Sequence, residues 1–99
     1  SSFIPSWTTR IPSTGRTLAS SGANGSFYAI LEPTSAIKGV TGFKVVKGQS
    51  AVLQFDSKGL LISAFTSAEL TSVIALTYSS TAGLFLLTVD GKIWQVSNS

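Results

Sequence analysis

The residues that could carry chemistry in this chain are few. Histidine and cysteine are absent, and the carboxylates are limited to Glu32, Asp56, Glu69 and Asp90. Asp56 and Asp90 could act as the paired acid and base of a glycosidase. Both fall in predicted turns, however, where Asp is favoured because its side chain hydrogen-bonds to the local backbone. We therefore expect both to be turn residues, and we find no other general base that would support hydrolysis.

A second candidate for chemistry is the pair Ser35 and Lys38, which has the S-x-x-K spacing of a serine–lysine nucleophile. The pair lies between Pro33 and Gly39, without the companion motifs of the enzymes that use this spacing. The four carboxylates are scattered along the chain and lack the spacing of a calcium loop. We predict that the protein is not an enzyme and that it holds no metal ion and no cofactor.

The composition is that of a small, unusually apolar domain. Of the 99 residues, 43% are apolar and only 11% are charged, and 17 Ser and 11 Thr supply most of the polarity. So much apolar side chain on one small domain predicts a surface that contacts another subunit. The net charge of +3 arises from scattered Lys and Arg rather than from a basic stripe. We therefore expect no nucleic-acid partner.

One segment has the length of a membrane span. Residues 70–89 form a run of 20 without a charge, about the length that a spanning helix needs. The turn signal at 79–83 predicts two strands joined by a turn instead, so we expect no membrane partner. No basic stretch followed by an apolar run begins the chain, and we therefore expect no secretion signal.

From residue 26 onward the sequence predicts β-structure. Short runs rich in β-branched and aromatic residues alternate with turn signals. The predicted strands are 26–31, 43–47, 51–56, 60–65, 73–78, 84–89 and 92–96. Asp90-Gly91 predicts a two-residue type I′ hairpin loop, and Thr66 and Glu69 have the spacing of a capping box for a helical turn at 67–71. The expected fold is all-β, a small antiparallel sandwich or barrel spanning 26–99.

Residues 1–25 read as an extended N-terminal arm. Pro5 and Pro12 disfavour helix for the residues before them. Apolar side chains recur along the segment, and they suggest an arm that lies on another chain or on its own sheet. The candidate anchors are Phe3, Ile4, Trp7 and Ile11.

Two further patterns concern assembly. Residues 49–64 and 82–97 each run strand, Asp-containing turn with Gly, strand, which looks like a duplicated meander. The strands at 60–65 and 84–89 are apolar on both faces, whereas a strand with one wet face would alternate. We expect the second face to meet a neighbouring subunit, with Phe85, Leu87 and Trp94 as interface residues and a homotrimer as the favoured state.

Two resemblances follow from these residues. The run 73–96, with VIAL, a loop and LFLLTVDGKIWQV, resembles a β-propeller blade, and two meanders per chain would then imply a trimeric lectin of the propeller type. The whole chain, Ser/Thr/Gly-rich, cysteine-free and β-rich with an extended arm, is similar to small virion proteins of tailed phages, in particular capsid decoration (cement) proteins.

The second resemblance implies a non-enzymatic structural protein on the capsid surface of a virion. Its partners would be its own copies and the major capsid protein, and it would reinforce the shell. One alternative is a carbohydrate-binding module that uses Trp94, Tyr78 or Tyr28, since aromatic side chains stack on sugars and anchor interfaces. A further alternative is a phage tail or baseplate adaptor, which differs only in its partner.

Overall fold

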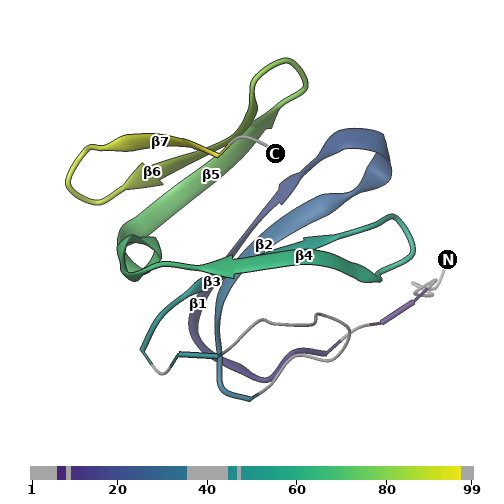
Figure 1. Ribbon diagram of the computed structural model, residues 1–99, viewed down its shortest axis with the longest axis horizontal. Coiled ribbons are helices and arrows are strands. Elements are labelled where there is room, and N and C mark those ends of the chain that lie inside the picture. The colour runs from purple at the N-terminus through teal and green to yellow at the C-terminus, as the bar shows by residue number, and fades with distance from the viewer. Residues whose placement is uncertain (1–6, 9, 36–44, 47, 97–99) are drawn as a thin grey trace, which may run out of the picture.

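The computed structural model describes residues 7–8, 10–35, 45–46 and 48–96. It consists of two antiparallel sheets, with strand orders β1-β2-β3-β4 and β5-β6-β7 (Figure 1). The elements in chain order are β1 (Ser13–Ser21), η1 (Ala23–Gly25), β2 (Phe27–Pro33), β3 (Ala51–Phe55), β4 (Leu61–Thr66), η2 (Ala68–Ser72), β5 (Val73–Ser79), β6 (Gly83–Thr88) and β7 (Ile93–Val96), where η denotes a short 3-10 helix. The prediction of an all-β fold with a small antiparallel sandwich is confirmed.

Most of the predicted strands are present. Strands β2 to β7 match six of the seven predicted ranges to within two residues at each end. The uncharged segment 70–89 consists mainly of β5 and β6 joined by a turn, as predicted. The seventh predicted strand, 43–47, lies largely outside the described residues, and Val45 and Val46, which are described, belong to no strand.

The predicted N-terminal arm contains a strand of nine residues. Residues 13–21 form β1, which pairs antiparallel with β2 and sets Leu18 opposite Ile30. The boundary predicted at residue 25 is therefore only the turn between two strands of one sheet. Two features hide this strand in the sequence. Gly15 has a φ of +76°, and the register shifts between Thr14 and Leu18, so the usual alternation is lost.

The predicted helical turn is η2, but its first residues differ from the expected capping box. The residue preceding the helix is Ser67, whose hydroxyl bonds the Glu69 carboxylate. The Thr66 hydroxyl instead donates to the Ser50 carbonyl at 2.7 Å. Thr66 therefore ties the end of β4 to the start of β3 and does not cap the helix.

Two hairpin turns share one hydrogen-bond pattern. In the β3–β4 turn, the Asp56 N–H donates to the Leu60 carbonyl at 2.9 Å and the Gly59 N–H donates to the Asp56 carbonyl at 3.0 Å. The β6–β7 turn, residues 88–92, repeats both bonds at 2.9 Å and 3.0 Å, with Gly91 in the place of Gly59. The φ angles of the two glycines are +83° and +85°. The meanders β2-β3-β4 and β5-β6-β7 thus share a turn geometry as well as a strand pattern.

The β6–β7 turn is not the predicted two-residue type I′ loop. Three residues, 89–91, separate the paired ends, and of these only Gly91 has a positive φ. A β-turn followed by one residue of positive φ is a common geometry for a three-residue hairpin loop. Asp90 therefore needs no left-handed backbone, and the type I′ prediction was wrong because it required one there.

The main core lies between the two sheets. Its members come from both sheets and from η2, and they are Tyr28, Ile30, Val52, Leu70, Val73, Leu84 and Leu86. Burying one such side chain is worth roughly 1.5–3 kcal/mol relative to leaving it exposed. Leu18 of β1 packs against the edge of this cluster, which is why a strand so rich in Ser and Thr still belongs to the sandwich.

A second cluster covers the opposite face of the four-stranded sheet. It comprises Ala29, Leu31, Ala51, Leu53 and Phe55, so β2 and β3 are buried on both faces. Of the two strands predicted to be apolar on both faces, β6 buries one face within this chain and β4 has no fully buried residue. Leu87 of β6 is 37% exposed and Ile62 of β4 is 53% exposed. Their second faces are therefore open to other molecules.

Candidate functional site

The three-stranded sheet has an outer face that is apolar and uncharged. Opposed residues in an antiparallel pair project to the same side of the sheet, and on β6 the core side belongs to Leu84 and Leu86. The other side carries Ala75, Thr77, Phe85, Leu87, Ile93 and Gln95, which we call the outer sheet face. Leu87 is 37% exposed and Ile93 is 73% exposed, and Phe85 is half-buried.

The sequence-predicted interface residues do not all share this face. Phe85 and Leu87 lie on it, whereas Trp94 pairs with Leu86 and projects to the core side. There Trp94 flanks a small groove of about 130 Å³ between β4 and β7, which we call the edge groove. Phe65 of β4 also lines that groove. The three predicted residues therefore mark two separate apolar surfaces.

The described part of the predicted arm is fixed to its own sheet. The Trp7 indole stacks on Phe27 with ring centroids 5.7 Å apart, and its Nε1–H donates to the Ser57 carbonyl at 3.1 Å. Ile11 packs against the second buried cluster. The two remaining predicted anchors, Phe3 and Ile4, lie outside the described residues.

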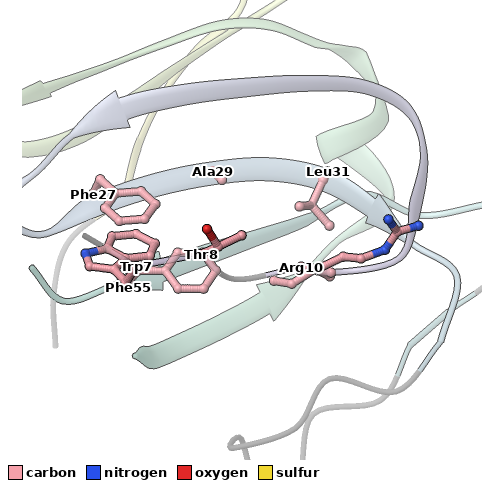
Figure 2. Close-up of a pocket in the computed structure, with 8 residues that line it drawn as sticks. Trp7, Thr8, Arg10, Phe27, Ala29, Leu31 and Phe55 are labelled. Carbon is pink, nitrogen blue, oxygen red and sulfur yellow. The ribbon is translucent and has the colours of Figure 1, made fainter. Parts of the chain in front are cut away.

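A groove lies beside this anchored segment, on the side of the four-stranded sheet away from the main core. It has a volume of about 670 Å³, and we call it the aromatic groove. Its described lining is Trp7, Thr8, Arg10, Ile11, Phe27, Ala29, Leu31 and Phe55. Phe27 stacks on Phe55 with centroids 5.0 Å apart, so three rings cluster at one end. Figure 2 shows the Arg10 guanidinium at the opposite end.

Sequence reasoning found only part of the aromatic groove. Trp7 and Ile11 were expected to anchor the arm, but Arg10 between them was given no role. Phe27 and Phe55 come from separate strands, and nothing local in the sequence indicates that their rings meet. The spacing of Trp7, Arg10 and Ile11 on one extended segment was the only available signal.

Asp56 and Asp90 lie in hairpin turns, as predicted, whereas Glu32 lies in β2 and Glu69 in η2. Asp56 Oδ1 accepts the Lys58 and Leu60 backbone N–H groups at 2.9 and 3.0 Å. The Thr88 hydroxyl donates to Asp90, and this bond, assisted by the nearby Lys92 charge, lowers the pKa of the Asp90 carboxyl. These oxygens stabilise local turns. Of the Ser35–Lys38 pair, Lys38 lies outside the described residues.

Glu69 is the remaining carboxylate of the helical turn, and Tyr28, Tyr78 and Trp94 are the aromatic residues proposed to bind carbohydrate. The Ser67 hydroxyl bond lowers the pKa of Glu69, which stays exposed. Tyr28 is 4% exposed and stacks on Tyr78 inside the sandwich. Tyr28 is therefore a core residue, and its ring is not available to stack on a sugar. Among the three aromatics proposed for carbohydrate, this leaves Tyr78, which is half-buried, and Trp94.

Comparison of the chain with protein-family models, with curated proteins and with solved structures finds no match. In the part of the chain that the structure describes, no helix is long and apolar enough to cross a bilayer. The function is therefore best derived from the three surfaces defined above: the outer sheet face, the edge groove and the aromatic groove.

Proposed function

We propose that this protein is a non-enzymatic structural protein that binds and reinforces a protein assembly, most specifically as a capsid decoration protein of a tailed phage. The observation that supports the proposal is the outer sheet face. Its large side chains, Leu87 and Ile93, are exposed at 37% and 73% in the isolated chain. Contiguous exposed apolar surface of this kind marks protein–protein contacts.

The chemistry of the outer sheet face suits association. None of its six residues is charged, so a partner that covers it buries no unpaired ion, whose desolvation costs several kcal/mol. Its polar members, Thr77 and Gln95, sit beside Phe85 in the register. Apolar side chains at the centre of a patch with polar groups around them are the usual anatomy of an interface.

Two distinct apolar surfaces favour a closed ring of copies. In a cyclic trimer each copy uses one patch to contact the next copy and a different patch to receive the previous one. The outer sheet face and the edge groove with Trp94 are two such patches, and they lie on opposite faces of the three-stranded sheet. A homotrimer built in this way would present one surface of each copy to a capsid or another virion lattice.

Co-sedimentation with tailed-phage capsids tests the proposal. Wild-type protein should pellet with the capsids. Ile93→Ser should stay in the supernatant, because loss of the contact between copies removes the multivalent attachment of the trimer to the capsid. Leu60→Ser is the matched control, since Leu60 is 64% exposed but lies at the β3–β4 turn. It should behave as wild type. Equal pelleting of Ile93→Ser would contradict the proposal, as would failure of the wild type to bind.

A second candidate function rests on Trp94. This indole is 41% exposed beside the edge groove, and a half-open indole is the kind of side chain that stacks on a sugar ring. A carbohydrate-binding module would show saturable binding on a glycan array that Trp94→Ala abolishes. A decoration protein, or an adaptor of the tail or baseplate, would show no such binding.

A further inference from the structure

The aromatic groove differs from the surfaces above because it is a recess with one polar end. About 670 Å³ of space is bounded by Trp7, Thr8, Arg10 and Ile11 and by residues of β2 and β3. Small-molecule sites in proteins are concave, are mainly apolar and measure roughly 300–1,000 Å³, with a few polar groups that orient the ligand. The groove has this size and this composition.

The polar end is provided by a single cation. Arg10 is the one charged residue in the described lining. It makes no ion pair or hydrogen bond with any other described residue. Glu32 follows Leu31 along β2, and since successive side chains of a strand alternate, it projects to the other side of the sheet. Arg10 therefore faces the groove without a carboxylate to neutralise it.

The apolar end of the aromatic groove favours a ligand with a flexible alkyl chain over a ligand with a flat aromatic ring. Trp7 and Phe55 both stack on Phe27, at 5.7 and 5.0 Å between centroids. With the rings already engaged with one another, the groove offers packing surface more than a free aromatic face. Ala29 and Leu31 extend this surface along β2 towards Arg10 (Figure 2).

We propose that the aromatic groove binds an alkyl carboxylate, with the carboxylate on the Arg10 guanidinium and the alkyl chain along Ala29 and Leu31 to the Trp7–Phe27–Phe55 cluster. A guanidinium and a carboxylate form paired N–H···O bonds with defined geometry. The Thr8 side chain lies beside the aromatic rings at the other end of the groove (Figure 2), so Arg10 alone contacts the headgroup. The groove and the outer sheet face lie on opposite sides of the sandwich, so the proposal stands independently of the assembly role.

Fluorescence titration tests the site directly. The chain has two tryptophans, Trp7 and Trp94, so Trp94→Phe leaves Trp7 as the sole reporter within the groove. The probes are decanoate, decan-1-ol and decylammonium, which share one alkyl chain and differ in headgroup charge. Decanoate should bind saturably and change the Trp7 emission. Decan-1-ol should bind about tenfold more weakly, because one charge-assisted contact is lost, and decylammonium should not bind.

Variants at Arg10 distinguish binding through the carboxylate headgroup from nonspecific hydrophobic binding of the alkyl chain. Arg10→Gln should weaken decanoate about tenfold, to the affinity of decan-1-ol, and should leave decan-1-ol unchanged. Arg10→Glu should reverse the preference, so that decylammonium binds and decanoate does not. Lys58→Gln is the matched control, because it removes an exposed cation from the β3–β4 turn outside the groove. It should bind decanoate as wild type does.

The proposal is overturned if decanoate gives no saturable change in Trp7 emission. It is equally overturned if the three headgroups bind alike, or if Arg10→Gln and Arg10→Glu keep wild-type affinity for decanoate. Arg10 is exposed, so these substitutions remove no core packing. Circular dichroism on each variant checks that it is folded.

Discussion

The indole ring of Trp7 lies directly on Gly59. A Cβ added at Gly59 would sit 2.6 Å from Cε3 of Trp7, closer than real contacts allow. The glycine therefore serves two purposes, since it also holds a φ of +83° in the β3–β4 turn. This contact holds the N-terminal segment on the β3–β4 turn. The hydrogen bond from Trp7 to the Ser57 carbonyl, fifty residues away in the chain, holds it on the same turn.

The repeated turn supplies a matched test of that contact. Gly91→Ala, at a φ of +85° with nothing within 4 Å of the new Cβ, should cost only the backbone strain, about 1–2 kcal/mol. Gly59→Ala should cost the same strain plus displacement of the Trp7 ring. The comparison is made by chemical denaturation of both variants, and Gly59→Ala should be clearly the less stable.

The Trp7→Ala background isolates the ring contact. In that background Gly59→Ala and Gly91→Ala should be equally destabilising, because no ring remains over Gly59. If the two glycine variants already have equal stability with Trp7 present, the indole does not pack on the turn in solution.

Removal of residues 1–25 should abolish folding. That deletion takes away β1, which pairs with β2 and packs Leu18 on the main core. It also removes Ile11, which packs against the second cluster. Far-ultraviolet circular dichroism should show loss of the β signal. A cooperative thermal transition in the truncated chain would contradict the placement of β1 in the sheet.

The Asp90 carboxyl predicts a modest acid sensitivity of the β6–β7 turn. The Thr88 hydroxyl and then the Lys92 charge lower its pKa from the ordinary 3.8. A lowered folded-state pKa means that the stabilisation is present above the ordinary value and is lost as the pH falls through the lowered one. Asp90→Asn should remove this part of the pH dependence, as measured by the thermal midpoint from neutral pH down to strongly acidic conditions.

The control for this titration is Glu69→Gln, since Glu69 is also exposed and also has a lowered pKa, through the Ser67 hydroxyl. It should leave the pH response of the β6–β7 turn intact. An NMR titration of the Asp90 side chain should give a midpoint below the ordinary Asp value. A midpoint at or above that value contradicts the Thr88 hydrogen bond.

The two faces of β6 should respond in opposite ways to polar substitution. Leu84 and Leu86 are 1% and 3% exposed in the main core, and their joint replacement by Ser should unfold the protein. Joint replacement of Phe85 and Leu87, on the outer sheet face, should leave the circular dichroism spectrum and a cooperative transition in place. Unfolding by both pairs would show that the outer face is part of the chain's own core.

Local patterns predicted the strands better than they predicted the contacts. Runs rich in apolar, β-branched and aromatic residues located β3 and β5, because side chains of these types favour the extended backbone of a strand. Strand β1 was not predicted because Gly15 and a register shift break its alternation. Among its side chains that the structure describes, Leu18 is the one hydrophobic residue that packs against the main core. The turn at Asp90-Gly91 was found, but its loop length was not, since positive φ at Gly91 alone satisfies a longer loop.

The sites could be predicted only in part, for a related reason. The sequence of β6 is apolar on both faces, and this predicted an interface on one of them. That Leu84 and Leu86 fill the core while Leu87 faces outward follows from how the two sheets pack, which alternation alone does not show. The aromatic groove depends on three rings from distant segments. The pairing of β2 with β3 sets Phe27 opposite Phe55, and Trp7 joins them by stacking on Phe27 and bonding the Ser57 carbonyl. Such pairing is long-range, and no local spacing encodes it.

The central claim is that the outer sheet face joins copies of this chain, and the most direct test is sedimentation velocity at micromolar concentration. The wild type should sediment as a trimer of the 10.3 kDa chain, and the folded Phe85→Ser, Leu87→Ser double variant should sediment as a monomer. A wild-type protein that is monomeric at that concentration, or a double variant that still assembles, would contradict the account.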